Sequence, residues 1–161
     1  MTSFYLAGKF SEANSFRTIA QALPDGCTVT APWYDFEQAD AAVREYSETL
    51  IVGQKELNGV ISADYYVGII NDPTYPYKGT LTEMGIALGW HSAHKVDTKS
   101  RVFLITPTTY TNTECVALRV PHTALATQVP IMSSTNIVDN LPVILEFIRH
   151  LASSNDTEYL S

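Results

Sequence analysis

The chain has 161 residues, 45% of them hydrophobic and 17% charged, which is typical of one folded domain and excludes a disordered chain. Seventeen acidic and ten basic residues give a net charge of −7, which disfavours binding to a nucleic acid polymer. No apolar run approaches the roughly 20 residues that span a bilayer, and the first ten residues do not resemble a secretion signal. Because two cysteines, Cys27 and Cys115, cannot form a disulfide framework, we expect a cytoplasmic protein.

Segments typical of strands and helices alternate along the whole chain. The strands are expected at residues 3–7, 27–31, 64–70, 101–106 and 129–133. The helices are expected at residues 11–23, at 38–62, from about 79 onward, and at 136–152. This alternation predicts an α/β fold in which one domain, residues 1–161, forms a doubly wound five-stranded parallel sheet with helices on both faces, as in flavodoxin-like and Rossmann-like proteins. Residues 154–161 are polar and are expected to form a loose tail.

Apolar residues at helical spacing indicate which face of each helix is buried. In the second helix the expected buried stripe consists of Tyr46, Leu50, Gly53, Leu57 and Val60. In the last helix the expected stripe consists of Val138, Leu141, Leu145 and Ile148.

The familiar phosphate-binding and zinc-binding motifs are missing from the sequence. GxGxxG, GxxxxGK[ST], HExxH and CxxC do not occur. His91 and His94 have the spacing to share a metal on one helix, but the sequence offers no obvious third ligand. We therefore expect neither a metal nor a cofactor, and we look for chemistry among the carboxylates.

Glu83 lies near the start of the helix that follows the central strand, inside the segment Gly79–Gly85. Ligands of doubly wound sheets bind at the carboxyl ends of the strands, where this helix begins, and its glycines allow a ligand to approach the backbone. A carboxylate there is well placed to act as a nucleophile. The alternative is structural, because Thr80 and Glu83 also have the spacing of a helix capping box.

Two further residues could assist this carboxylate. Glu56 stands late in the second helix, beside Lys55, and its alternative role is that of a solvated surface charge. Tyr5 lies in the first strand, where its alternative role is packing in the core, although a buried hydroxyl still needs a polar partner.

Three segments resemble the nucleoside 2-deoxyribosyltransferase family and the related 2′-deoxynucleoside 5′-monophosphate N-glycosidases. Residues 4–10 (FYLAGKF) resemble the family's first strand with its tyrosine and glycine turn. Residues 56–64 (ELNGVISAD) resemble the segment that ends in an Asp before the central strand. Residues 79–89 (GTLTEMGIALG) resemble the segment that carries the nucleophile, and Asn136 matches a residue with which a neighbouring subunit completes the site.

The resemblance implies a reaction and roles for several residues. Glu83 would attack the anomeric carbon of a 2′-deoxynucleoside to form a covalent deoxyribosyl-enzyme, and Tyr5 would orient its carboxylate. Glu56, where the family usually has Asp, would contact the sugar or help proton transfer. Asn136 would meet the 5′-hydroxyl from a neighbouring subunit, which implies a homo-oligomer. The glycine turns at Gly8 and Gly79 would let the substrate approach the backbone.

The residues that recognise the base are less well defined by the resemblance. The family's transferases usually carry an Asp six residues before the nucleophile, and here that position holds Tyr77. Asp72 is the candidate to replace it, because the loop is longer by one residue. Phe10, Trp33 and Tyr34 are candidates to stack on the base, and their alternative role is packing of a loop against the core.

Three functions therefore remain open at this point. The first is base exchange between 2′-deoxynucleosides, with nucleosides and free nucleobases as the binding partners. The second is hydrolysis, in which water resolves the same Glu83 ester of a nucleoside or a 5′-monophosphate. The third is a nucleotide-sensing domain without catalysis, which would have no need for the nucleophile.

Overall fold

The computed structural model describes residues 1–36, 45–94, 97, 99–110 and 114–160. Its centre is a sheet of five parallel strands in the order β2-β1-β3-β4-β5. The strands are β1 (Thr2–Ala7), β2 (Cys27–Val29), β3 (Tyr65–Ile69), β4 (Val102–Pro107) and β5 (Thr127–Met132). The sequence predicted all five, and their parallel arrangement is confirmed.

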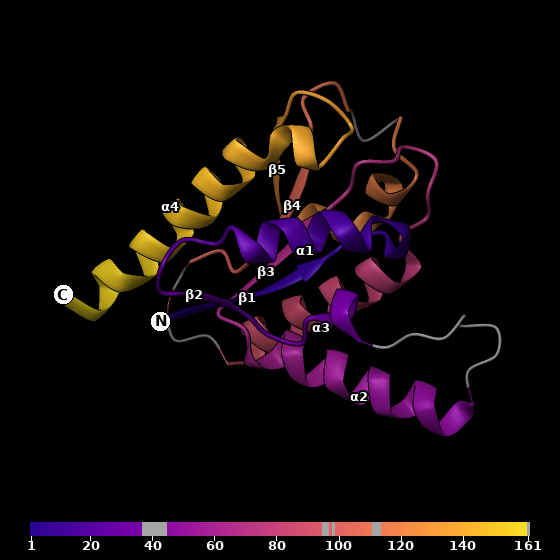
Figure 1. Cartoon of the computed structure of the whole chain (residues 1–161), viewed down its shortest axis with the longest axis horizontal. Coiled ribbons are helices and arrows are strands. Elements are labelled where there is room, and N and C mark those ends of the chain that lie inside the picture. Colours follow the sequence, from indigo (N-terminus) through magenta and orange to yellow (C-terminus); the bar gives the residue numbers. More distant parts are fainter. Residues whose placement is uncertain (37–44, 95–96, 98, 111–113, 161) are drawn as a thin grey trace.

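Four α-helices flank the sheet in the part of the chain that the structure describes, two on each face. They are α1 (Ala13–Gln21), α2 (Tyr46–Ser62), α3 (Lys78–Ala93) and α4 (Leu141–Leu160). Figure 1 shows α1 and α4 above the sheet and α2 and α3 below it. The predicted α/β architecture is therefore confirmed. None of the described helices is both long and apolar enough to cross a membrane.

The burial of each strand depends on its place in the sheet and on the helices that cover it. All five residues of β3 are buried, because β3 lies between β1 and β4 and is covered by helices on both faces. Strand β5 lies at the edge of the sheet and is only partly buried. Pro130, which cannot donate a hydrogen bond to a ladder, is therefore tolerated there, as the sequence predicted.

The prediction of a buried stripe on α2 is wrong. Tyr46, Leu50, Gly53 and Leu57 are all exposed, and of the five stripe residues only Val60 is buried. The residues of this helix that are buried are Gly59 and Val60, in its C-terminal turns. Of the segment predicted to begin this helix, residues 38–44 lie outside the described residues.

The last helix also differs from its prediction. Its buried face is formed by Ile144, Ile148 and Leu151, while Val138 is exposed in the 3-10 turn that precedes the helix. Leu141 and Leu145 are only partly buried. The helix continues to Leu160, so most of the expected tail is helical.

Candidate active site

A cavity of about 200 Å³ opens where the carboxyl ends of β1 and β3 meet. The chain leaves β1 toward α1 on one face and leaves β3 toward α3 on the other, so this is the point where a doubly wound sheet forms a crevice. The cavity is lined by Ala7, Gly8, Phe10, Trp33, Glu56, Tyr75, Tyr77, Gly79, Thr80 and Glu83. Seven of the predicted site residues therefore come together here from four separate segments of the chain.

Glu83 lies in the second turn of α3, and its Oε2 atom is buried without a hydrogen-bond partner among the described residues. Burial raises the pKa of Glu83 from its ordinary value of 4.5 to about 7, because the charged form loses its water. The neighbouring hydroxyl of Tyr5 opposes this rise in pKa, and the Glu56 carboxylate adds to it. At neutral pH the carboxyl group therefore stands between its two protonation states.

Tyr5 lies on β1 under the cavity, and its side chain is fully buried. Burial and the Glu83 carboxylate raise the pKa of Tyr5 far above its ordinary value, so the hydroxyl keeps its proton. The two groups are close enough to shift each other's pKa, yet Tyr5 Oη and Glu83 Oε2 both lack a hydrogen-bond partner. Tyr5 is thus available as a hydrogen-bond donor to the carboxylate.

Tyr66 is a supporting residue that the sequence reasoning missed. It pairs with Tyr5 across β1 and β3, and the two rings stack with centroids 5.8 Å apart. Its hydroxyl donates to the carbonyl of Thr80 at 2.6 Å, which ties the first turn of α3 to the sheet. The signal was present in the sequence, since a tyrosine in a buried central strand must find a partner for its hydroxyl.

Thr80 holds the same turn from the other side. Its hydroxyl donates to the carbonyl of Gly8 at 3.2 Å, and α3 begins at Lys78 with no side chain capping it. The capping-box alternative for Thr80 and Glu83 is therefore wrong, because Thr80 is inside the helix and bonds to another segment. Glu83 has no capping role that would explain its burial.

Two glycines shape the cavity wall. A Cβ atom on Gly8 would lie 2.2 Å from the Phe16 ring, so only glycine fits where α1 crosses the end of β1. A Cβ atom on Gly79 would lie 3.9 Å from Glu83 Oε1. The side of the cavity next to the carboxylate is therefore left open by the absence of a side chain at position 79.

Aromatic side chains form the opposite wall. Phe10 is 55% exposed, and its ring lies 6.3 Å from that of Trp33, centroid to centroid. Trp33 is itself fixed, because its indole N–H donates to the carbonyl of Leu6 at 2.7 Å. These two residues are placed to accept a planar ring, whereas Tyr34 is buried and does not line the cavity.

Tyr77 lines the cavity, but its hydroxyl is fully used within its own loop. It accepts hydrogen bonds from the backbone N–H groups of Asn71 and Asp72, both at 3.0 Å, and donates to Asn71 Oδ1 at 2.8 Å. Asp72 does not line the cavity and forms an ion pair with Lys9 at 2.8 Å. Lys9 and the N–H of Thr74 lower the pKa of Asp72 to about 2, so Asp72 is a poor proton donor.

Asn136 also stands apart from this cavity. It is exposed, and its Oδ1 accepts a hydrogen bond from the N–H of Asp139 at 3.2 Å, at the start of the last helical segment. Asn136, Asp72 and Tyr34 are thus predicted site residues that do not line the cavity with Glu83.

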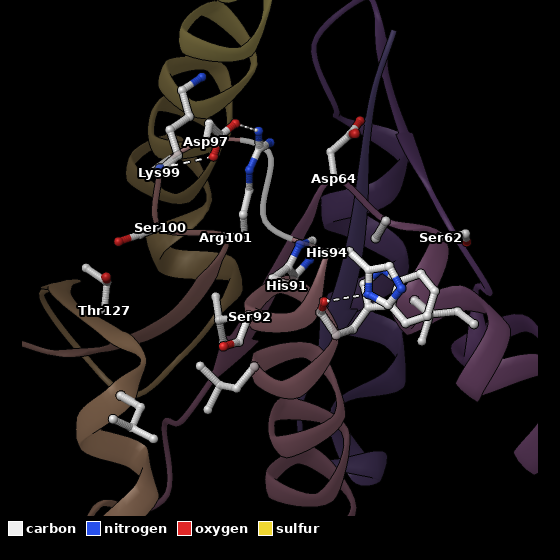
Figure 2. Close-up of a pocket in the computed structure, with 16 residues that line it drawn as sticks. Ser62, Asp64, His91, Ser92, His94, Asp97, Lys99, Ser100, Arg101 and Thr127 are labelled. Atoms are coloured by element: carbon white, nitrogen blue, oxygen red, sulfur yellow. Dashed lines mark hydrogen bonds and ion pairs between the residues drawn. The ribbon is translucent and has the colours of Figure 1, made fainter.

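A second cavity, of about 470 Å³, lies at the other end of the sheet, near the amino ends of β3, β4 and β5. Figure 2 shows that Asp97 bonds there both to Arg101 and to the backbone of Lys99. Asp64 is also satisfied, because its Oδ2 accepts hydrogen bonds from the backbone N–H and hydroxyl of Ser3. His91 and His94 both line this cavity, but no cluster of metal-binding side chains occurs in the described part of the chain.

Scans of the sequence against protein-family models and against curated proteins find no match. Any assignment of function therefore depends on the geometry of the cavity and on the three segments that resemble the nucleoside 2-deoxyribosyltransferase family.

Proposed function

We propose that the protein is a nucleoside 2-deoxyribosyltransferase that exchanges the base of 2′-deoxynucleosides through a covalent ester on Glu83. The observation that carries this proposal is the buried, unpartnered carboxyl oxygen of Glu83, set in a cavity beside the Tyr5 hydroxyl. A buried group without a partner costs about 1–3 kcal/mol, so its place in a cleft indicates use by a ligand.

In the first half of the reaction, a Glu83 carboxylate oxygen forms a bond to C1′ as the bond from C1′ to the base breaks. The electron pair of that bond leaves with the base, and C1′ carries positive charge in between. Tyr5 donates a hydrogen bond that holds the carboxylate in line, and Glu56 is the second carboxyl group able to contact the sugar or pass a proton to the base.

In the second half, a nitrogen of the incoming base attacks C1′ as the bond from C1′ to Glu83 breaks, which releases the Glu83 carboxylate, and the proton of that nitrogen passes to Glu56, which gave a proton to the leaving base. The aromatic wall of Phe10 and Trp33 suits a planar base in both halves, because aromatic rings stack on any base. The same proposal includes a homo-oligomer in which Asn136 serves a neighbouring subunit's cavity, in agreement with its exposure and its distance from this one.

An uncharged nucleoside suits this cavity better than a 5′-monophosphate. No Lys or Arg is among the lining residues in the described part of the chain. The two nearby candidates are engaged elsewhere, since Lys9 pairs with Asp72 and Arg17 pairs with Asp35. A phosphate group would therefore bring negative charge next to two carboxyl groups without a counter-charge.

The experiment incubates the protein with deoxyinosine, with and without adenine, and separates the products by chromatography. Base exchange yields deoxyadenosine only when adenine is present. Free hypoxanthine and deoxyribose without adenine would indicate hydrolysis instead, and no turnover of either kind would favour a sensing domain.

The variant Glu83→Gln is expected to lower the rate of exchange at least 10³-fold, because the amide cannot form the ester. Intact-mass spectrometry of the wild type with deoxyinosine alone is expected to show a deoxyribosyl adduct that the variant lacks. The matched control is Glu146→Gln, an exposed carboxyl on α4 beside Arg149. Exchange at the wild-type rate by Glu83→Gln would remove Glu83 from the mechanism.

A further inference from the structure

Lys9 places a positive charge at the edge of the cavity that holds Glu83. It stands between Gly8 and Phe10, which both line that cavity. Its ammonium nitrogen lies 5.1 Å from the ring centre of Tyr75, another lining residue. A lysine in this position could meet a phosphate group on a bound ligand, because lysine binds phosphate as a point charge.

Asp72 engages this lysine. Its Oδ2 atom lies 2.8 Å from Lys9 Nζ, and the side chains of Lys9 and Asp72 are 24% and 29% exposed. Its Oδ1 atom accepts hydrogen bonds from the backbone N–H of Thr74 at 3.0 Å and from the Thr74 hydroxyl at 2.9 Å. Since Thr74 fixes the carboxylate from the other side, Asp72 is prearranged as the partner of Lys9.

Both members of this pair are charged at neutral pH. The hydrogen bond from Lys9 lowers the pKa of Asp72 to about 2, and the same bond raises the pKa of Lys9. Glu12 also raises the pKa of Lys9. Its own carboxylate, however, accepts hydrogen bonds from Asn71 Nδ2 at 2.9 Å and from the Ser15 hydroxyl at 3.4 Å. Among the described residues, Asp72 is therefore the acid that forms an ion pair with Lys9.

The ion pair opposes a ligand that carries a phosphate group. Such a ligand would have to separate Lys9 from Asp72 and would then lie beside the Asp72 carboxylate, where like charges repel. An uncharged 5′-hydroxyl has neither cost. Loss of the charge on Asp72 would therefore favour a phosphate group twice, by releasing Lys9 and by removing the repulsion.

We propose that Asp72 is a specificity-determining residue, which makes this cavity select 2′-deoxynucleosides over their 5′-monophosphates by engaging Lys9. The inference rests on the proposed function, because it concerns the substrate class of the same cavity. Asp72 acts through Lys9 from outside the cavity lining. The preference for an uncharged nucleoside is therefore expected to change with one substitution that leaves Glu83 and Tyr5 in place.

The test compares the binding of deoxyinosine and of its 5′-monophosphate, measured by titration calorimetry. All variants carry Glu83→Gln, so that no ester forms and neither ligand is consumed. With no other change, deoxyinosine is expected to bind about tenfold more tightly than the monophosphate. Adding Asp72→Asn is expected to tighten the binding of the monophosphate about tenfold and to leave that of deoxyinosine within about twofold.

Asparagine has the shape of aspartate, so Asp72→Asn changes little except the charge. Its Oδ1 can still accept both hydrogen bonds from Thr74, whereas its Nδ2 offers no acceptor to Lys9. The matched control is Asp35→Asn, which breaks the ion pair of Asp35 with Arg17 at 2.7 Å, away from the cavity lining. This control is expected to leave the preference for deoxyinosine unchanged.

A further variant tests whether Lys9 mediates the effect. Lys9→Met added to Asp72→Asn is expected to abolish the gain in binding of the monophosphate. Its loss would exclude Lys78, an exposed lysine beside the lining residue Gly79, as the source of the gain, because Lys78 is present in every variant.

Three results would overturn the inference. They are equal binding, or no binding, of the two ligands before Asp72 is changed, an Asp72→Asn variant with the same preference, and a gain that persists after Lys9→Met. Whether the wild type exchanges bases is decided separately, by the products from deoxyinosine and adenine. Absence of exchange together with the expected shift in binding would overturn the proposed chemistry and support the role of Asp72 in the choice of ligand.

Discussion

The cavity at the carboxyl ends of the strands is less than half as large as the cavity at their amino ends, about 200 against about 470 Å³. In the larger cavity the charges are satisfied by neighbours, as in the pair of Asp97 with Arg101. In the smaller one, Glu83 and the adjacent Tyr5 keep buried oxygens without partners. The two cavities therefore differ most in how far their polar groups are satisfied.

This difference identifies the functional end of the molecule better than size does. The unpartnered group of the larger cavity is His91 Nε2, and burial together with Arg101 lowers the pKa of His91, which favours its neutral form. A neutral imidazole without a partner costs less than a carboxylate without one. Among the described residues, the smaller cavity holds a buried acidic group, Glu83, whose pKa is raised to about 7.

The sharpest measure of that difference is the dependence of stability on pH. Because the folded state raises the pKa of Glu83 from 4.5 to about 7, it holds this proton more tightly than the unfolded chain does. The stability that results is present in full below pH 4.5 and is lost as pH rises through 7. Wild type is therefore expected to lose up to about 3 kcal/mol relative to Glu83→Gln between pH 4.5 and 8.

The measurement is urea unfolding of both proteins at several pH values. Glu146→Gln on the exposed side of α4 controls for the loss of an ordinary carboxyl group. If the free energy of unfolding of wild type and of Glu83→Gln changed equally with pH, the pKa of Glu83 would not be raised. The smaller cavity would then no longer differ from the larger one in holding a carboxyl group of raised pKa.

A smaller effect is expected from Tyr5→Phe. The hydroxyl of Tyr5 lowers the pKa of Glu83, so its removal raises that pKa further and leaves less carboxylate at pH 7. For a pKa rise of about one unit, from about 7, we expect base exchange at pH 7 to fall about fivefold and to recover almost fully at pH 9. A loss independent of pH would assign Tyr5 a different role. Tyr65→Phe on β3, outside both cavity linings, is the control.

The smallest effect is expected at the other end of the sheet. Asp97→Asn removes the charge that pairs with Arg101 at 2.6 Å. Because both side chains are partly exposed, we expect a loss of about 1 kcal/mol in the free energy of unfolding. Base exchange is expected to stay within twofold of the wild type. A tenfold loss of exchange would indicate that the larger cavity takes part in the reaction.

The fold was largely predictable because its signals are local. A strand buried on both faces, such as β3, needs an unbroken apolar run, and the turns between elements are marked by proline and glycine. The exposure of α2 was not predictable, because Tyr46, Leu50 and Leu57 have the spacing of a buried stripe and yet all three are exposed. Periodicity predicts which side chains share one face of a helix, but whether that face is buried depends on the packing of the whole domain.

The candidate site also has one part that the sequence predicts and one part that it does not. The glycines and the carboxylates of the cavity follow from motifs that are contiguous in the sequence. Asp72 could not be judged from the sequence, because its ion pair with Lys9 joins residues 63 positions apart. The role of Tyr77 could not be predicted from the sequence either. Its hydroxyl bonds within a loop whose shape depends on the left-handed backbone at Tyr77, where φ is 52°.

The stacked pair of Tyr5 and Tyr66 has a consequence for local unfolding. Both rings belong to the two central strands, which open only when the whole domain unfolds, whereas the N-terminal turns of α2 can open by themselves. Fraying of α2 would displace Glu56 and leave Tyr5 under Glu83. Hydrogen exchange should therefore protect the amides of β1 and β3 far longer than those of α2, so Tyr5, which orients the nucleophile, stands on a slowly opening strand.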